Sequence, residues 1–123
     1  MQCLLHGSAT ADALVRHGHT THLPAEVGLS ADAVPEELLR AAHAKQWDIV
    51  TTDPVLAMTL FEKPQPFGRS IVFLQLTPTE AAEPVDPIDR LFTRYKRLTP
   101  GRLYTVTASR VKIRQLPMAR TGI

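Results

Sequence analysis

The chain has 123 residues, of which 44% are hydrophobic and 21% charged, and this composition excludes an intrinsically disordered protein. Its single cysteine, Cys3, excludes a disulfide within a monomer, and no apolar run approaches the roughly 20 residues that span a bilayer. We therefore expect one cytoplasmic domain without a membrane partner, in which Cys3 is a small buried hydrophobe. The start of the chain lacks a basic lead and a long apolar core, so a strand is expected there rather than a signal peptide.

The net charge of +2 conceals an uneven distribution along the chain. Residues 1–61 hold 3 Lys and Arg against 7 Asp and Glu, a net charge of −4, whereas residues 62–123 hold 11 against 5, a net charge of +6. No acidic residue follows Asp89. Such a basic half indicates an anionic partner, most commonly nucleic acid, or a homodimer in which the basic segment faces the acidic half of the second copy.

Alternating strand and helix patterns predict an α/β fold with a mostly parallel central sheet and helices on both faces. Strands are expected at residues 2–6, 20–23, 48–52 and 71–74, and loops at 25–34 and 77–87. Helices are expected from Ala11, capped by Ser8 or Thr10, and from Pro35, at 54–61 and at 88–98. Residues 102–107 and 110–114 predict a hairpin that turns at 108–109 and forms an antiparallel edge.

The stretch from Asp48 to Pro54 contains a buried strand pattern, then an acid, then a proline. Proline fits the first turn of a helix, so Asp53 is predicted to be the N-cap of the helix that follows. Ligands of open α/β sheets bind beyond the carboxyl ends of the strands, which makes Asp53 a candidate site residue as well. The sequence leaves both roles open.

Short motifs follow one another in order over nearly the whole chain: Leu4-Leu5, Gly18-His19, Gly28-Leu29, Glu36-Glu37-Leu38-Leu39, Thr51-Thr52-Asp53, Ile71–Leu76, Arg102-Leu103 and Arg110–Arg114. In this order and spacing they resemble the PIN-like proteins of the DUF5615 type. The resemblance implies a single PIN-like domain over residues 1–123 and a metal-dependent ribonuclease, in some members the toxin of a bacterial toxin–antitoxin pair. It also implies RNA and an antitoxin-like protein as partners.

The same resemblance implies a cluster of acids that holds Mg²⁺ or Mn²⁺ at the carboxyl edge of the sheet. At the four acidic positions this chain has His6, Pro35 followed by Glu36 and Glu37, Asp53 and Val55. The implied catalytic residues are Asp53, Glu37, Glu36 and His6, and the implied metal ligands are Asp53, Glu37 and His6. Because His6 and Val55 stand where the family has carboxylates, we expect weak or no Mg²⁺ binding and an impaired nuclease. His6 remains a possible ligand, since imidazole favours Mn²⁺ or Zn²⁺ over Mg²⁺. The two glutamates equally suit the positive end of a helix dipole.

Three histidines within six residues, His17, His19 and His22, raise a zinc hypothesis, although they straddle a helix end and a strand, which favours separate structural roles. The candidate nucleic-acid-binding residues are Arg90, Arg94, Arg97, Arg110, Lys112 and Arg114. The first three are spaced as one stripe of a helix and the last three alternate along a strand, so they form one positive surface if both sets face the same side. They equally suit a solvated surface or an oligomer interface.

Two interpretations of function remain besides an impaired ribonuclease. One is a non-catalytic module that binds RNA or a protein through the basic C-terminal half, and the other is a structural partner in a complex. Tyr95 and Tyr104 lie among the basic residues and suit base stacking, but Tyr95 also fits the apolar side of its helix.

Overall fold

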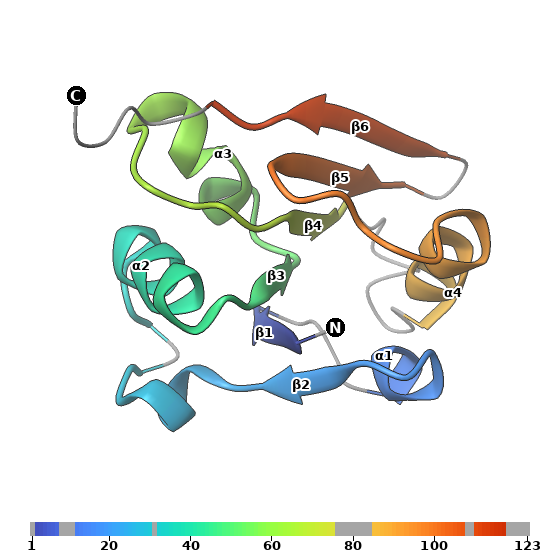
Figure 1. Cartoon of the computed structure of the whole chain (residues 1–123), viewed down its shortest axis with the longest axis horizontal. Coiled ribbons are helices and arrows are strands. Elements are labelled where there is room, and N and C mark those ends of the chain that lie inside the picture. Colours follow the sequence, from blue (N-terminus) through green and yellow to red (C-terminus); the bar gives the residue numbers. More distant parts are fainter. Residues whose placement is uncertain (1, 8–11, 31, 76–84, 108–109, 118–123) are drawn as a thin grey trace.

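The computed structural model describes residues 2–7, 12–30, 32–75, 85–107 and 110–117, which form a sheet between two layers of helices (Figure 1). The strands are β1 (Gln2–His6), β2 (Thr20–His22), β3 (Asp48–Thr51), β4 (Ile71–Leu74), β5 (Arg102–Val106) and β6 (Val111–Gln115). The helices are α1 (Asp12–Arg16), η1 (Pro24–Val27, a 3₁₀ turn), α2 (Pro35–Lys45), α3 (Pro54–Glu62) and α4 (Val85–Arg94). Within these ranges no helix is long and apolar enough to cross a membrane.

The sheet has the strand order β2-β1-β3-β4-β5-β6. The first five strands are parallel, and β6 runs antiparallel to β5 at the edge. The apolar strand β4 lies inside the sheet, and the C-terminal hairpin closes one side of it, so both predictions are confirmed. After β1 the chain forms β2 on one side of β1 and then crosses to form β3 on the other side. The strand order therefore reverses between β1 and β3.

Each face of the sheet carries its own apolar core. Helices α1 and α4 cover one face, and α2 and α3 cover the other (Figure 1). Because successive side chains of a strand point to opposite faces, Leu5 and Val50 belong to the α1/α4 core, whereas Leu4 and Ile49 belong to the α2/α3 core. Cys3 is fully buried, as predicted, and burial, with the charge of Asp48 as a smaller cause, raises the pKa of its thiol to about 12.

Two predicted boundaries are wrong. The segment expected to be a loop from residue 25 begins with the turn η1, and α4 runs from Val85 to Arg94 rather than from 88 to 98. After α4 the chain leaves the helix because Tyr95 packs edge to face on Tyr104 and the backbone N–H of Thr99 donates to the Tyr104 hydroxyl at 2.8 Å. The predicted cap at Ser8 or Thr10, most of the loop 77–87 and the turn at 108–109 lie outside the described residues.

Candidate functional site at the carboxyl edge of the sheet

His6 and Asp53 lie at the point where the strand order reverses. In the parallel pair of β1 and β3, His6 is opposite Thr51, so the ends of both strands reach the same edge and Asp53 follows two residues later. We expect His6, Asp53 and at least one of Glu36 and Glu37 to converge at one edge of the sheet, and the structure bears this out for His6 and Asp53, which lie at the ends of adjacent strands. This edge is also where doubly wound sheets with the strand order 2-1-3-4-5 bind their ligands.

Thr51 links the two candidate residues directly. Its side chain is fully buried, and its hydroxyl accepts a hydrogen bond from the backbone N–H of Asp53 at 2.9 Å. The same oxygen lies 2.9 Å from His6 Nδ1. Since the Thr51 oxygen already accepts from Asp53, its hydroxyl can donate its own proton to Nδ1 of His6. In this arrangement Nδ1 is the acceptor, and the imidazole carries its proton on Nε2. Burial lowers the pKa of His6, although the charge of Asp53 acts in the opposite direction.

Gly7 allows the end of β1 to approach the end of β3. Its φ of +71° lies in the left-handed region, and a Cβ at this position would collide with the hydroxyl oxygen of Thr52. A larger residue would therefore separate the two strand ends that carry His6 and Asp53.

Asp53 acts as the helix cap that its position before Pro54 predicts. Its Oδ1 accepts a hydrogen bond from the backbone N–H of Val55 at 2.9 Å, at the start of α3. One carboxylate oxygen is thus already engaged in the fold. Any ligand of Asp53 has to share this carboxylate with the cap.

An open cleft of about 620 Å³ lies in front of these residues. It is lined by His6, Gly7, Asp32, Ala33, Val34, Pro35, Asp53 and Val55. The sequence interpretation missed Asp32, whose carboxylate is exposed at this cleft. The available signal was an acid three residues before Pro35, in a connection that must cross the carboxyl edge.

The two glutamates do not join this group. Neither Glu36 nor Glu37 lines the cleft, although Pro35 directly before them does. Glu36 instead faces Lys63, with 3.9 Å between the charged atoms, and its backbone carbonyl accepts a hydrogen bond from Gln65. Their positions in the first turn of α2 suit the helix dipole, the second role that the sequence left open.

The donors at the cleft are an imidazole and two carboxylates, His6, Asp32 and Asp53. Although all three line the cleft, neither they nor any other three His, Cys, Asp or Glu side chains of the described ranges form a group that could hold a metal ion. Asp53 shares one oxygen with the helix cap and Nδ1 of His6 is bonded to Thr51.

The three clustered histidines have separate structural partners. His17 hydrogen bonds to Asp89 at 2.8 Å, and His19 packs on Phe92 with 4.4 Å between the ring centroids. His22 stacks on Trp47, with ring centroids 3.9 Å apart and the planes 4° from parallel. This arrangement corresponds to the structural interpretation of the three histidines.

The six candidate basic residues do not form one surface. Arg97 lies beyond the end of α4, so the predicted stripe of three arginines along a helix is wrong. Helix α4 packs on the face of the sheet to which Val106 of β5 points, whereas Leu103 of β5 points to the other face. Arg114 of β6 is the cross-strand partner of Leu103. Cross-strand partners share a face, so the arginines of α4 and the basic residues of β6 lie on opposite sides of the sheet.

Comparisons with protein-family models, with curated proteins and with solved structures find no match for this chain.

Proposed function

We propose that this chain is a cytoplasmic PIN-like protein that binds RNA through the basic residues of its C-terminal half and whose metal site is impaired. The observation that carries the proposal is a set of cations that form no ion pair with a described acidic residue. The ion pairs between described residues use Arg16, His17, His22, Lys63 and Arg69. Every described cation from Arg90 to Arg114 is without such a pair. Phosphate groups could supply the missing negative charge.

The basic residues of the last strand suit a phosphate backbone best. We call Arg110, Lys112 and Arg114 the β6 row. All three are exposed; Lys112 and Arg114 alternate along one face of β6, the edge strand of the described sheet, and Arg110 directly precedes this strand. Successive members are two residues apart, which corresponds to about 7 Å along a strand. The Arg114 guanidinium lies over the ring of Phe61 at 4.0 Å, which holds one end of the row in position. A row of this kind can follow a single strand of RNA without reading its sequence.

Impairment of the metal site is the other half of the proposal. The resemblance to metal-dependent ribonucleases requires a cluster of acids, and the cleft offers Asp53 and Asp32 with His6 in the position of an acid. We therefore expect little or no binding of Mg²⁺ and no cleavage of RNA with Mg²⁺. If cleavage is seen with Mn²⁺ alone, the variant His6→Asp should extend it to Mg²⁺, because a carboxylate replaces the softer imidazole.

The test is a comparison of charge-reversal variants in a binding assay with single-stranded RNA at low salt. The double variant Arg110→Glu/Lys112→Glu should reduce the affinity at least tenfold. The double variant Arg40→Glu/Lys45→Glu changes the net charge equally on exposed residues of α2 and should change the affinity much less. Asp53→Ala should leave the affinity unchanged.

A protein partner is the second candidate, and the exposed edge of β6 favours it. In the described part of the chain no strand pairs with the outer edge of β6, and such an edge with basic side chains can accept an acidic strand from an antitoxin-like protein or from a second copy of this chain. Absence of RNA binding at low salt, together with a dimer whose mass is halved in the Arg110→Glu/Lys112→Glu variant, would favour this candidate and reject the first.

A further inference from the structure

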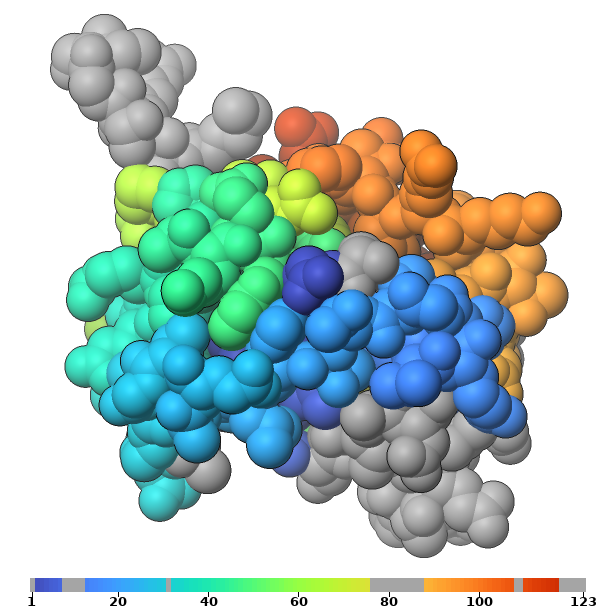
Figure 2. Space-filling view, turned by 60° about the horizontal axis from the view of Figure 1, so that its bottom comes forward, coloured from blue at the N-terminus to red at the C-terminus, as the bar shows by residue number. Residues whose placement is uncertain are grey.

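A basic hollow of about 340 Å³ lies at the amino edge of the sheet, opposite the cleft with His6 and Asp53. Turns and strand ends from four parts of the chain form it, and its lining consists of Gly18, His19, Asp48, Arg69, Lys96, Arg97 and Leu98. Figure 2 shows the turn before β2 and the segment after α4 side by side on one face of the molecule. The hollow therefore depends on the fold and not on any one motif.

The charges in the basic hollow favour an anion. The buried carboxylate of Asp48 already accepts hydrogen bonds from the N–H and hydroxyl of Ser70, at 2.9 and 2.8 Å, and from Arg69 Nη2 at 3.2 Å. Arg69 Nε is buried and has no hydrogen-bond partner among the described residues. Lys96 and Arg97 are exposed at the rim and likewise pair with no described acid. One neutralised acid and three cations leave a net positive charge that suits a phosphate group.

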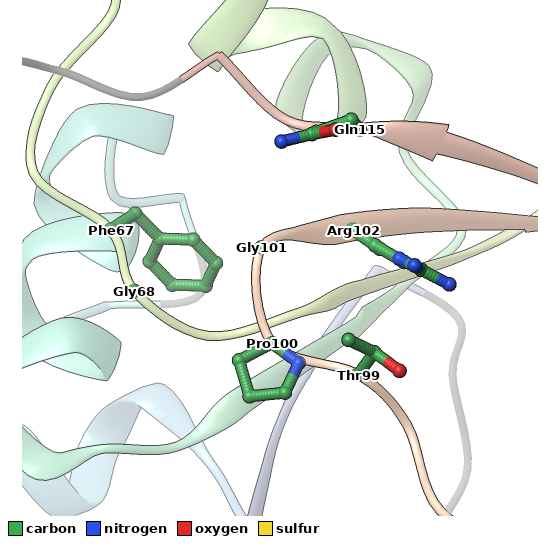
Figure 3. Close-up of a pocket in the computed structure, with 7 residues that line it drawn as sticks. All are labelled: Phe67, Gly68, Thr99, Pro100, Gly101, Arg102 and Gln115. Carbon is green, nitrogen blue, oxygen red and sulfur yellow. The ribbon is translucent and has the colours of Figure 1, made fainter.

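A second hollow of about 370 Å³ lies at the same edge of the sheet, before β4 and β5 (Figure 3). We call it the aromatic hollow, and it is lined by Phe67, Gly68, Thr99, Pro100, Gly101, Arg102 and Gln115. The two hollows have different lining residues, but two segments run from one to the other, because Gly68 precedes Arg69 and Leu98 precedes Thr99 in the chain.

Backbone hydrogen bonds hold these walls in place. The N–H of Gly101 donates to the carbonyl of Arg69 at 3.0 Å, and the N–H of Leu116 donates to the carbonyl of Gly101 at 2.9 Å. The N–H of Gly68 donates to Nδ1 of His43 at 3.1 Å. The bond between Gly101 and Arg69 thus joins the lining of the aromatic hollow to that of the basic hollow.

The aromatic hollow has the groups that a planar base requires. In Figure 3 the ring of Phe67 points across the hollow toward Gly101, and the side-chain amide of Gln115 lies on another side. An aromatic ring offers a stacking surface for any base, and an amide can donate to and accept from the edge of a base. The hollow lies within the size range of small-molecule sites.

We infer that the two hollows together form a binding site for a nucleoside monophosphate, with the phosphate group in the basic hollow and the base against Phe67 in the aromatic hollow. The site lies at the edge opposite the cleft, and it does not include the β6 row. It does not require that the β6 row bind RNA, so either proposal can fail while the other stands.

The experiment is isothermal titration calorimetry of the full chain with adenosine 5′-monophosphate, inorganic phosphate, ribose 5-phosphate and adenosine. The monophosphate should bind at least tenfold more tightly than each of the other three probes. In the double variant Lys96→Gln/Arg97→Gln, the affinity for all three phosphate-containing probes should fall at least tenfold. The matched variant Arg40→Gln/Lys45→Gln, which removes two exposed cations from α2, should bind as the natural chain does.

The base is tested separately with Phe67→Leu and Gln115→Ala, which should weaken adenosine 5′-monophosphate and leave inorganic phosphate unchanged. Circular dichroism of each variant would show that the fold is intact. The inference is overturned if the monophosphate fails to bind at millimolar concentration, or if the Arg40/Lys45 control weakens it as much as the Lys96/Arg97 variant. A monophosphate that binds no more tightly than inorganic phosphate would also reject a nucleotide site.

Discussion

The hydroxyl of Thr51 can be removed without a change of shape by Thr51→Val, and this variant tests how the candidate site is built. The substitution leaves the N–H of Asp53 without its acceptor at 2.9 Å and Nδ1 of His6 without its partner at 2.9 Å. Each lost hydrogen bond costs about 1 kcal/mol, and an unsatisfied buried donor costs roughly 1–3 kcal/mol. Because Asp53 and His6 are only half-buried, water compensates in part, and we expect a total loss of about 2 kcal/mol.

The assay is urea denaturation of the natural chain, of Thr51→Val and of Thr105→Val, a control at a half-exposed threonine of β5. A loss of about 2 kcal/mol corresponds to a melting temperature lower by roughly 6–12 °C in a domain of this size. The control should stay within about 0.5 kcal/mol of the natural chain. Equal losses in both variants would contradict the proposed link between Thr51 and the site.

The pKa of His6 gives a second result for Thr51→Val that a loss of packing alone would not produce. A hydroxyl that donates to Nδ1 stabilises the neutral imidazole, so its removal should raise the pKa of His6 toward its ordinary value, as NMR titration would show. A pKa that falls instead would mean that Nδ1 carries the proton and donates to Thr51.

Three further predictions concern pH and buried polar groups. Burial lowers the pKa of His6 and of His19 in the folded chain, so the unfolded chain binds more protons. The free energy of unfolding should therefore fall as the pH decreases through about 6.5, the ordinary pKa of histidine, toward the lowered values. The variant His6→Asn should show a smaller fall between about pH 7.5 and 5.5. Cys3, with its thiol pKa near 12, should react with Ellman's reagent at pH 8 only on unfolding, and rapid reaction in the folded chain would contradict its burial. Asp48→Ala removes the acceptor of three hydrogen bonds and should cost about 2–4 kcal/mol in urea denaturation, against about 0.5 kcal/mol or less for the exposed control Asp32→Ala.

The sequence predicts the sheet and the closeness of His6 and Asp53 because both depend on local patterns and one topological rule. Apolar runs bounded by proline and glycine identify the strands, and the carboxyl ends of parallel strands meet at one edge. Asp32 could not be predicted in the same way, because the segment before Pro35 has no periodicity that positions a side chain. The helix boundary at Arg94 depends on packing between Tyr95 and Tyr104, which helical spacing alone cannot reveal.

The hollows at the amino edge and the separation of the basic residues depend on relations between distant segments. Gly18 precedes β2, Arg69 precedes β4 and Lys96 lies between α4 and β5, so they meet only through the order in which the strands assemble. Several strand orders are compatible with the same local patterns. Similarly, whether Arg94 and Lys112 share a face depends on the pairing register of β5 and β6. These features follow from the assembled sheet, and the sequence pattern did not predict them.

The most direct test of the proposed function measures RNA affinity and RNA integrity in the same samples, with EDTA, with Mg²⁺ and with Mn²⁺. We expect single-stranded RNA to bind equally well in EDTA and to remain intact in Mg²⁺. The logarithm of the binding constant should fall with the logarithm of the salt concentration by about 0.7 for each phosphate contacted, and this slope should be smaller in Arg110→Glu/Lys112→Glu. RNA that is shortened in Mg²⁺ by the natural chain and left intact by Asp53→Ala would contradict the account, since it would show a working metal site at the cleft.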